Sequence, residues 1–126
     1  MHPAPASSLP NPDPASLGQV FTPEHVVRAM LRLRHNSGRV LEPSCGDGAF
    51  LRHLHHTVGI ELDPLQCPPG AHNMDFFAYP VGEKFDTVIG NPPYVRYQDI
   101  APATRALLHQ DGFDGRSNLY FFFIQK

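Results

Sequence analysis

Asn91-Pro92-Pro93-Tyr94 is the segment of this sequence whose residue types and order point most clearly to chemistry. The two prolines fix the backbone and remove two N–H donors. A rigid pair of acceptors remains, the side-chain oxygen of Asn91 and the carbonyl oxygen of Pro92, beside the flat ring of Tyr94. Such a segment can accept both hydrogens of a planar amino group while Tyr94 stacks on the ring that carries it. Accepting both hydrogens draws the nitrogen toward tetrahedral geometry and frees its lone pair for attack.

Two other segments carry residues suited to a nucleoside. Gly46 and Gly48 lie in a turn before an expected helix, where the backbone can approach a ligand closely. Glu61 follows Gly48 by 13 residues and can accept two hydrogen bonds from a ribose diol. Asp75 can accept from an exocyclic amine, and the Phe76 ring can cover a purine face. The glycine pair lacks the third glycine of a dinucleotide motif, so the pattern indicates a nucleoside without a clear pyrophosphate.

These residues must be positioned by strands that alternate with helices. We expect strands at about 39–42, 57–61, 72–74 and 85–89, and helices at 22–33, 49–56, 102–110 and 118–126. Thr22 is expected to cap the first helix, with Pro23 at its first helical position. Alternation predicts an α/β fold with a parallel sheet and right-handed crossovers, in which ligands bind beyond the carboxyl ends of the strands. The candidate polar residues all lie at such ends: Glu42, Glu61, Asp75 and Asn91.

Length and composition limit the classes of protein that this chain can represent. It has 126 residues and a formal net charge of −2, with 10 basic and 12 acidic side chains, which argues against a free-standing nucleic-acid binder. It has no apolar run long enough for a transmembrane helix and no secretory signal. Cys45 and Cys67 match neither a zinc nor a redox spacing, so we expect reduced thiols in a cytoplasmic protein.

Two segments are set apart from the predicted site. Residues 1–17 are rich in proline and polar residues and are expected to form a disordered tail, which leaves 18–126 as the folded part. His53, His55 and His56 lack the i, i+4 spacing of a helical metal site and have no evident acidic or Cys partner nearby, so no metal site is expected.

Several motifs, in order, resemble those of the gamma-class N6-adenine DNA methyltransferases of type II restriction–modification systems. They are Phe21-Thr22-Pro23, Val40–Leu51 with Glu42-Pro43-Ser44-Cys45-Gly46-Asp47-Gly48 at its centre, Gly59–Pro64, Asp75-Phe76, Gly90–Arg96 and Asn118-Leu119-Tyr120. The resemblance covers residues 18–126. It implies a Rossmann-like fold that binds S-adenosyl-L-methionine.

The resemblance also implies a role for each matching residue. Those expected to hold the cofactor are Thr22, Glu42, Pro43, Cys45, Gly46, Gly48, Glu61, Asp75 and Phe76, with Glu61 on the ribose and Asp75 and Phe76 at the adenine. Asn91 and Pro92 would accept hydrogen bonds from N6 of the target adenine, and Tyr94 would stack on that base. The base would be flipped out of double-stranded DNA, because a duplex hides the amino group.

The chain departs from the family's pattern at its end. It stops at Lys126, so we expect a C-terminally truncated fold that lacks the family's later strands and its target-recognition domain. That expectation accounts for the missing positive charge, since most DNA contacts would belong to the absent part. It also predicts an exposed apolar edge on the strand at Asp86–Ile89. A cognate restriction enzyme is a further expected partner.

Two other interpretations of the same motifs remain open at this point. A protein-glutamine N5-methyltransferase can use the same Asn-Pro-Pro-Tyr segment, because a carboxamide nitrogen is also planar and conjugated. The Phe-Thr-Pro element and the Glu-Pro-Ser-Cys-Gly turn favour DNA as the substrate. Alternatively, the 126-residue chain is a non-catalytic fragment with at most weak cofactor binding.

Overall fold

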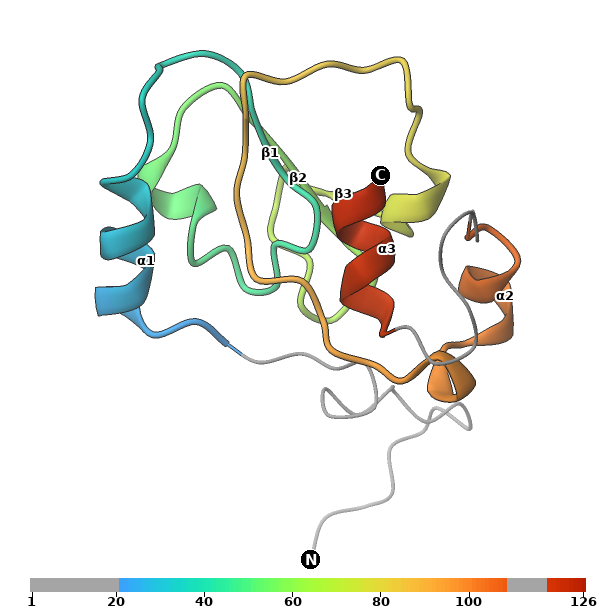
Figure 1. Ribbon diagram of the computed structural model, residues 1–126. Helices are drawn as coiled ribbons and strands as arrows, with labels where there is room; N and C mark the ends of the chain where they lie inside the picture. The colour runs from blue at the N-terminus through green and yellow to red at the C-terminus, as the bar shows by residue number, and fades with distance from the viewer. Residues whose placement is uncertain (1–20, 109–117) are drawn as a thin grey trace, which may run out of the picture.

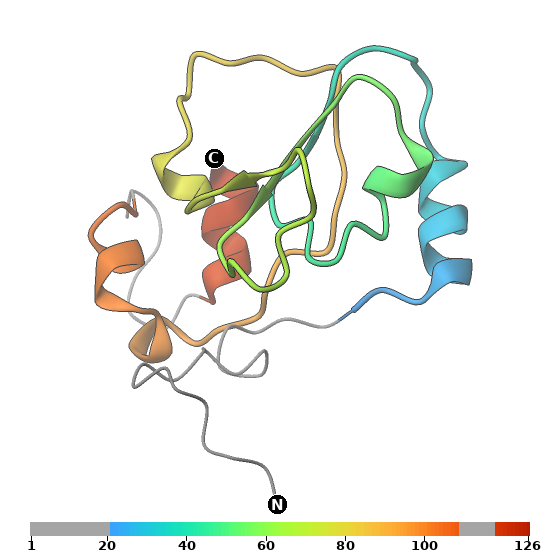
Figure 2. The same cartoon turned by 180° about the vertical axis from the view of Figure 1, so that it is seen from behind.

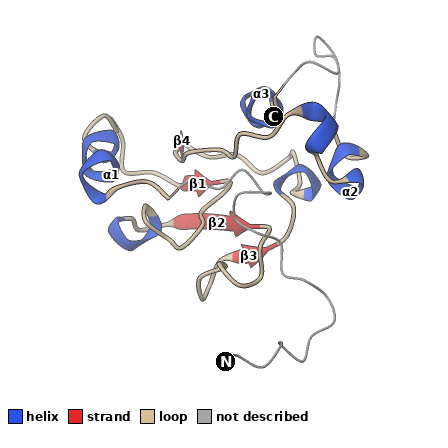
Figure 3. Ribbon diagram, turned by 90° about the horizontal axis from the view of Figure 1, so that it is seen from below, coloured by secondary structure: helices blue, strands red, loops and turns tan. Residues whose placement is uncertain are grey.

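The computed structural model describes residues 21–108 and 118–126, so the tail expected at 1–17 lies outside the described residues. Its centre is a parallel four-stranded sheet with the strand order β3-β2-β1-β4. The strands are β1 (Val40–Glu42), β2 (Thr57–Glu61), β3 (His72–Asn73) and β4 (Thr87–Val88). Figure 3 shows β1, β2 and β3 pointing in the same direction, toward α2 (Pro102–Arg105). The expected α/β fold with a parallel sheet is confirmed.

The sheet is covered on both faces because alternate residues of a strand point to opposite sides. Val40 packs with Phe50 and Ile89 against Val27 of helix α1 (Glu24–Leu31). Its neighbour Leu41 packs on the other face with Ile60 and Phe76, and Phe123 of helix α3 (Leu119–Gln125) lies against that cluster. Figures 1 and 2 show α1 and α3 on opposite sides of the strands. The sheet is therefore the middle of a three-layer arrangement.

The first helix begins differently from the sequence prediction. Pro23, not Thr22, is the N-cap of α1, and no side chain caps the helix. The backbone carbonyl of Pro23 instead accepts from Val26 and Val27, both at 3.0 Å. Thr22 is thereby left outside the helix, where its hydroxyl can contact the loop after β4.

Two expected helices are shorter than predicted. The segment 49–56 forms only the 3₁₀ turn Leu51–His53, because the backbone is already extended at Leu54, and His56 has a φ of 54° before β2. Phe50 is nevertheless buried, and Leu51 and Leu54 are half-buried. The prediction that these three side chains face inward was therefore correct, whereas the predicted helix was wrong. The helix expected at 102–110 is the four-residue α2, and residues 109 and 110 lie outside the described part.

The sheet edge at β4 is open among the described residues. β4 pairs with β1 through Val40↔Thr87 and Leu41↔Val88, and it has no second partner in that part of the chain. Val88 is 63% exposed, as expected for an apolar strand without a neighbour. No helix within 21–108 and 118–126 is long and apolar enough to cross a membrane.

Candidate active site

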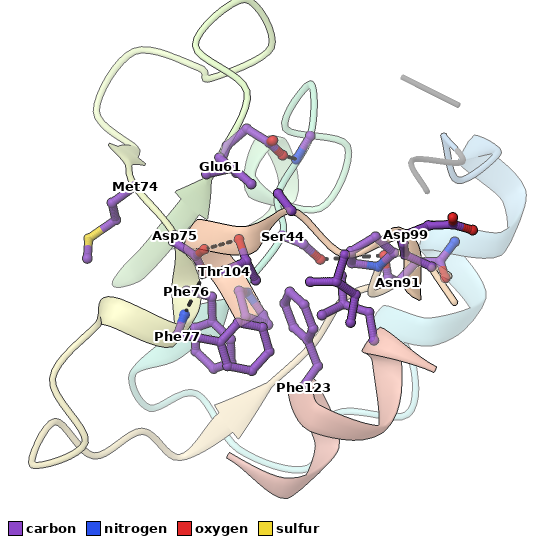
Figure 4. Close-up of a pocket in the computed structure, with 18 of the residues that line it drawn as sticks. Ser44, Glu61, Met74, Asp75, Phe76, Phe77, Asn91, Asp99, Thr104 and Phe123 are labelled. Atoms are coloured by element: carbon purple, nitrogen blue, oxygen red, sulfur yellow. Dashed lines mark hydrogen bonds between the residues drawn. The ribbon is translucent and has the colours of Figure 1, made fainter. Parts of the chain in front are cut away.

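A cavity of about 370 Å³ lies beyond the carboxyl ends of the strands. Figure 4 shows Glu61 on one side of it, Asp75 and Thr104 on another, and Ser44 and Asn91 toward the loop after β4. Three phenylalanine rings, Phe76, Phe77 and Phe123, gather below these polar groups. This volume is within the range of sites for small ligands and cofactors. The topology therefore brings the ends of all four strands to one concave site.

The turn after β1 borders this site through Pro43, Ser44 and Gly46. Gly46 and Gly48 have φ values of 54° and 88°, a region that L side chains rarely adopt. The N–H of Gly48 donates to the Cys45 carbonyl at 2.9 Å and closes the turn. A Cβ at Gly48 would lie 3.3 Å from Cγ of Pro68, so conformation and space both favour glycine there.

Glu61 is the acid that fixes this turn to β2. Its carboxylate accepts from the N–H of Gly46 through Oε1 and from the N–H of Asp63 through Oε2, each at 2.8 Å. The residue is 3% exposed, yet it borders the cavity. Two carboxylate oxygens offer about four acceptor positions, so one such group can serve the protein and a ligand's hydroxyl groups together.

Glu42 lies behind the cavity wall. It is 1% exposed, and its Oε2 has no hydrogen-bond partner among the described residues. Burial, with the negative charges of Glu61 and Asp47, raises the pKa of Glu42 to about 8. A Cβ at Gly90 would come within 2.8 Å of Glu42 Oε1, so the loop after β4 passes close to this acid. Glu42 thus carries a buried carboxyl group that a nearby cation would help to ionise.

Asp75 is held from two sides at the end of β3. Its Oδ1 accepts from the N–H of Phe77 at 2.9 Å, and its Oδ2 accepts from the Thr104 hydroxyl in a short hydrogen bond. Thr104 is 7% exposed and lies on α2, which is 29 residues further along the chain. The sequence prediction missed Thr104 because a single threonine on a short helix has no distinguishing local signal.

The apolar floor of the cavity was also missed, apart from Phe76. The Phe76 and Phe123 rings stack with centroids 5.2 Å apart, and Phe77 meets Phe123 edge-on at 4.9 Å. Aromatic pairs prefer these offset and edge geometries. Phe123, in the apolar segment Tyr120–Ile124 of α3, supplies this wall of the cavity.

The loop after β4 holds Asn91 near the glycine turn. Its amide nitrogen lies 3.5 Å from the Thr22 hydroxyl, and its backbone carbonyl lies 3.5 Å from the Ser44 hydroxyl, both long contacts. The Asn91 amide N–H thus faces Thr22, which leaves the side-chain oxygen available as an acceptor. Asn91 and Pro93 both border the cavity.

Tyr94 lies at the outer side of the same loop. It is 54% exposed, and its ring meets the Tyr120 ring edge-on, with centroids 5.1 Å apart. The next residue, Val95, is tied to the start of α3, because its N–H donates to Asn118 Oδ1 at 2.9 Å and its carbonyl accepts from Leu119 at 2.8 Å. The Asn118 side chain also caps α3 by accepting from the N–H of Tyr120. The Tyr94 ring therefore contacts Tyr120 on one side and is exposed to solvent on the other.

The structure divides the candidate residues into two groups. Those that border the cavity are Pro43, Gly46, Glu61, Asp75, Phe76 and Asn91. Those that lie around it without bordering it are Thr22, Glu42, Cys45, Gly48, Pro92 and Tyr94. Burial raises the pKa of the Cys45 thiol, so this side chain is a neutral packing group, and its backbone N–H donates to Ile60 at 2.8 Å.

Of the histidines near the 3₁₀ turn Leu51–His53, His53 has an acidic partner, contrary to the sequence expectation. His53 lies 2.7 Å from Glu24 of α1, which also pairs with Arg28 at 3.3 Å. Within the part of the chain that the structure describes, no group of three His, Cys, Asp or Glu side chains could hold a metal ion.

Comparison with known proteins finds one group of relatives. Residues 69–126 match the family described as Eco57I restriction-modification methylase. A type II methyltransferase of Thermus thermophilus is 38% identical over 144 aligned residues, which cover 97% of this chain and 34% of the relative. The type II methyltransferase M.HincII of Haemophilus influenzae is 36% identical over 94 aligned residues, which cover 68% of this chain and 19% of the relative.

A viral relative extends the group. The modification methylase CviBIII of Paramecium bursaria Chlorella virus NC1A is 34% identical over 102 aligned residues, which cover 69% of this chain and 26% of that protein. The chain thus spans no more than about a third of the length of these curated relatives. With a parallel α/β sheet and a strand-end cavity as well, the chain is similar to a part of the type II restriction–modification methyltransferases.

Proposed function

We propose that this chain supplies the catalytic site of a DNA methyltransferase that transfers a methyl group from S-adenosyl-L-methionine to N6 of adenine. The observation that carries the proposal is the cavity that Glu61, Asp75 and Asn91 share. Glu61 and Asp75 offer carboxylate acceptors that would suit a nucleoside, and Asn91 begins the segment that would suit a planar amino group. A methyl donor and a methyl acceptor would therefore meet at one site.

The cofactor half of the site comprises the Pro43–Gly48 turn, Glu61, Asp75 and Phe76. Glu61 would accept hydrogen bonds from the ribose hydroxyls, and Asp75 would accept from the adenine amino group over the aromatic floor. The Pro43–Gly48 turn, backed by the buried Glu42 carboxyl group, would hold the methionine end. S-adenosyl-L-methionine carries two cationic groups, and the acidic surroundings of Glu42 suit a ligand of that charge. When bound, the cofactor supplies a methyl group on a sulfonium, a strong electrophile.

The target half of the site comprises Asn91, Pro92 and Tyr94. The side-chain oxygen of Asn91 and the carbonyl of Pro92 would accept the two hydrogens of the adenine amino group, which makes the nitrogen lone pair available. Tyr94 would stack on the flipped base, and its 54% exposure leaves room for a base to arrive from outside. Alignment of the two reactants is the main contribution of these residues.

Double-stranded DNA is the proposed partner, with most of the phosphate contacts made outside this chain. The net charge of −2 leaves little attraction for a polyanion. The relatives are longer, and the matching family bears a restriction–modification name, so a cognate restriction enzyme is a second proposed partner.

Methyl transfer can be tested in a chimera in which this chain replaces the matching third of the Thermus thermophilus relative. We expect the chimera to methylate N6 of adenine in duplex DNA, and Asn91→Ala to abolish transfer while leaving cofactor binding within about twofold. Labelled cofactor should be offered in parallel to DNA and to a glutamine-containing release factor. Label on the release factor alone, or undiminished transfer by Asn91→Ala, would contradict the proposal.

A further inference from the structure

The ammonium group of Lys126 lies against the turn that follows Asp75. Its Nζ donates to the carbonyls of Phe76, Phe77 and Tyr79 at 3.0, 3.1 and 2.6 Å. The same nitrogen lies 5.0 Å from the centre of the Phe76 ring, a cation–π distance. One side chain at the end of α3 thus makes four contacts with a short segment about 50 positions earlier.

This segment needs a partner for its carbonyl groups. Within the single 3₁₀ turn Phe76–Ala78 the Phe76 carbonyl accepts from the Tyr79 N–H at 2.9 Å, but the turn is not continued, so the Phe77 and Tyr79 carbonyls lack the donors that a longer helix would supply. A lysine at the end of a helical turn can satisfy such groups and match their partial negative charge. The backbone of Lys126 is itself fixed, since its N–H donates to the Phe122 carbonyl of α3 at 3.1 Å.

The turn held in this way is the one that orients the adenine end of the candidate site. Asp75 caps it through Phe77, and the Phe76 ring stacks on Phe123 at the floor of the cavity. Displacing the turn would move an acceptor and a ring wall together. Lys126 does not border the cavity, so an effect on ligand binding would have to pass through the turn.

We propose that Lys126 is a positioning residue for the nucleoside part of the cofactor, because its ammonium group clamps the Phe76–Ala78 turn and so fixes Asp75 and Phe76 at the cavity. The inference rests on the proposed function, since it takes the cavity to be a nucleoside site. It concerns a residue that none of the sequence motifs includes.

The first test measures the turn without any ligand. In the full 126-residue chain, amide hydrogen exchange at Phe77, Ala78 and Tyr79 should be at least tenfold faster in Lys126→Met than in the unaltered chain. The reference is the Val40 amide, which begins β1 and donates to the His56 carbonyl at 3.0 Å. A clamp predicts faster exchange at the turn alone, whereas equal acceleration at Val40 would mean general destabilisation and would overturn the proposal.

The second test measures binding by titration with S-adenosylhomocysteine and with adenosine, which lacks the amino-acid end. Lys126→Met should weaken both about tenfold, because both share the nucleoside, and Lys126→Arg should restore most of the affinity. The control is Lys84→Met, which alters the other lysine of the chain and should leave both affinities unchanged.

The outcomes of the titration separate the two proposals. If the unaltered chain binds both compounds and Lys126→Met binds them equally well, the role of Lys126 is wrong and the proposed function stands. If the unaltered chain binds neither compound, the nucleoside site is wrong and the positioning role for Lys126 is wrong with it.

Discussion

In the cofactor half, the Glu61 and Asp75 carboxylates are each held at both oxygens by donors of the protein, and both border one cavity. In the target half, the contacts to Asn91 are 3.5 Å long, and Tyr94 is more than half exposed. The side chains of the cofactor half are therefore held in place without a ligand, whereas those of the target half have weaker contacts and are at least partly exposed to solvent.

This contrast matches the sizes of the two proposed ligands. A small cofactor can be surrounded by one chain, and a preformed set of donors and acceptors lowers the cost of ordering it. A base carried on duplex DNA must enter from outside, so its half must stay open until the substrate supplies the remaining contacts. The two halves can be compared by measuring how much a substitution in each one lowers the free energy of unfolding.

Among the substitutions at residues of the two halves, Glu61→Ala in the cofactor half has the largest expected effect. The change leaves the N–H groups of Gly46 and Asp63 without their acceptor in a buried setting, and we expect the free energy of unfolding to fall by about 3 kcal/mol. Urea denaturation measures this loss. Glu61→Gln is the matched control, since its amide oxygen keeps one of the two bonds and should lose roughly half as much. A loss below about 1 kcal/mol for Glu61→Ala would remove the distinction between the halves.

A second effect concerns pH and Glu42. Its pKa is raised from 4.5 to about 8 in the folded chain, so between these values the folded state keeps a proton that the unfolded state has released. Stability should therefore fall as pH rises through this window, by about 1.4 kcal/mol per pH unit, and should level off above pH 8 and below pH 4.5. Glu42→Gln should flatten this dependence in urea titrations at several pH values. A slope that persists in the variant would assign it to another group.

A smaller effect is expected where α3 supports the target half. Asn118→Ala removes the N-cap of α3 and the acceptor for the Val95 N–H, which should lower the free energy of unfolding by about 1 kcal/mol. Asn118→Asp keeps an acceptor and should lose much less. In the chimera, Asn118→Ala should slow methyl transfer while cofactor affinity stays unchanged. Equal loss of cofactor affinity would show that the halves are not independent.

The sequence could predict the strand ends because parallel topology alone brings them together. Glu61 ends β2, while Asp75 and Asn91 follow β3 and β4, yet the carboxyl ends of those strands lie at one edge of the sheet. Contacts that arise only from tertiary packing could not be predicted from the order of strands and motifs in the sequence. Thr104 reaches Asp75 from a four-residue helix, and Lys126 reaches the turn after Asp75 from the end of α3, contacts that depend on how the helices dock.

The helix errors have a physical cause of the same kind. The segment 49–56 has inward-facing apolar residues at helical spacing, but such a pattern describes only burial. The backbone becomes extended at Leu54 and has a φ of 54° at His56 before β2, so only the Leu51–His53 turn is helical. At Thr22 the capping preference was overruled because Pro23 supplies the carbonyl that begins α1.

The smallest expected effect is that of Tyr94→Ala, and it tests the open half most directly. Tyr94 is 54% exposed and its aromatic contact is the edge of Tyr120, so its loss should change the free energy of unfolding by about 0.5 kcal/mol or less. Phe122→Ala is the contrasting aromatic change in α3, where a residue only 2% exposed should cost about 3 kcal/mol or more. In the chimera, Tyr94→Ala should nevertheless reduce methyl transfer strongly while the protein remains folded. A large decrease in the free energy of unfolding for Tyr94→Ala would mean that the Tyr94 ring is packed in the core. The target half could then no longer be described as solvent-exposed.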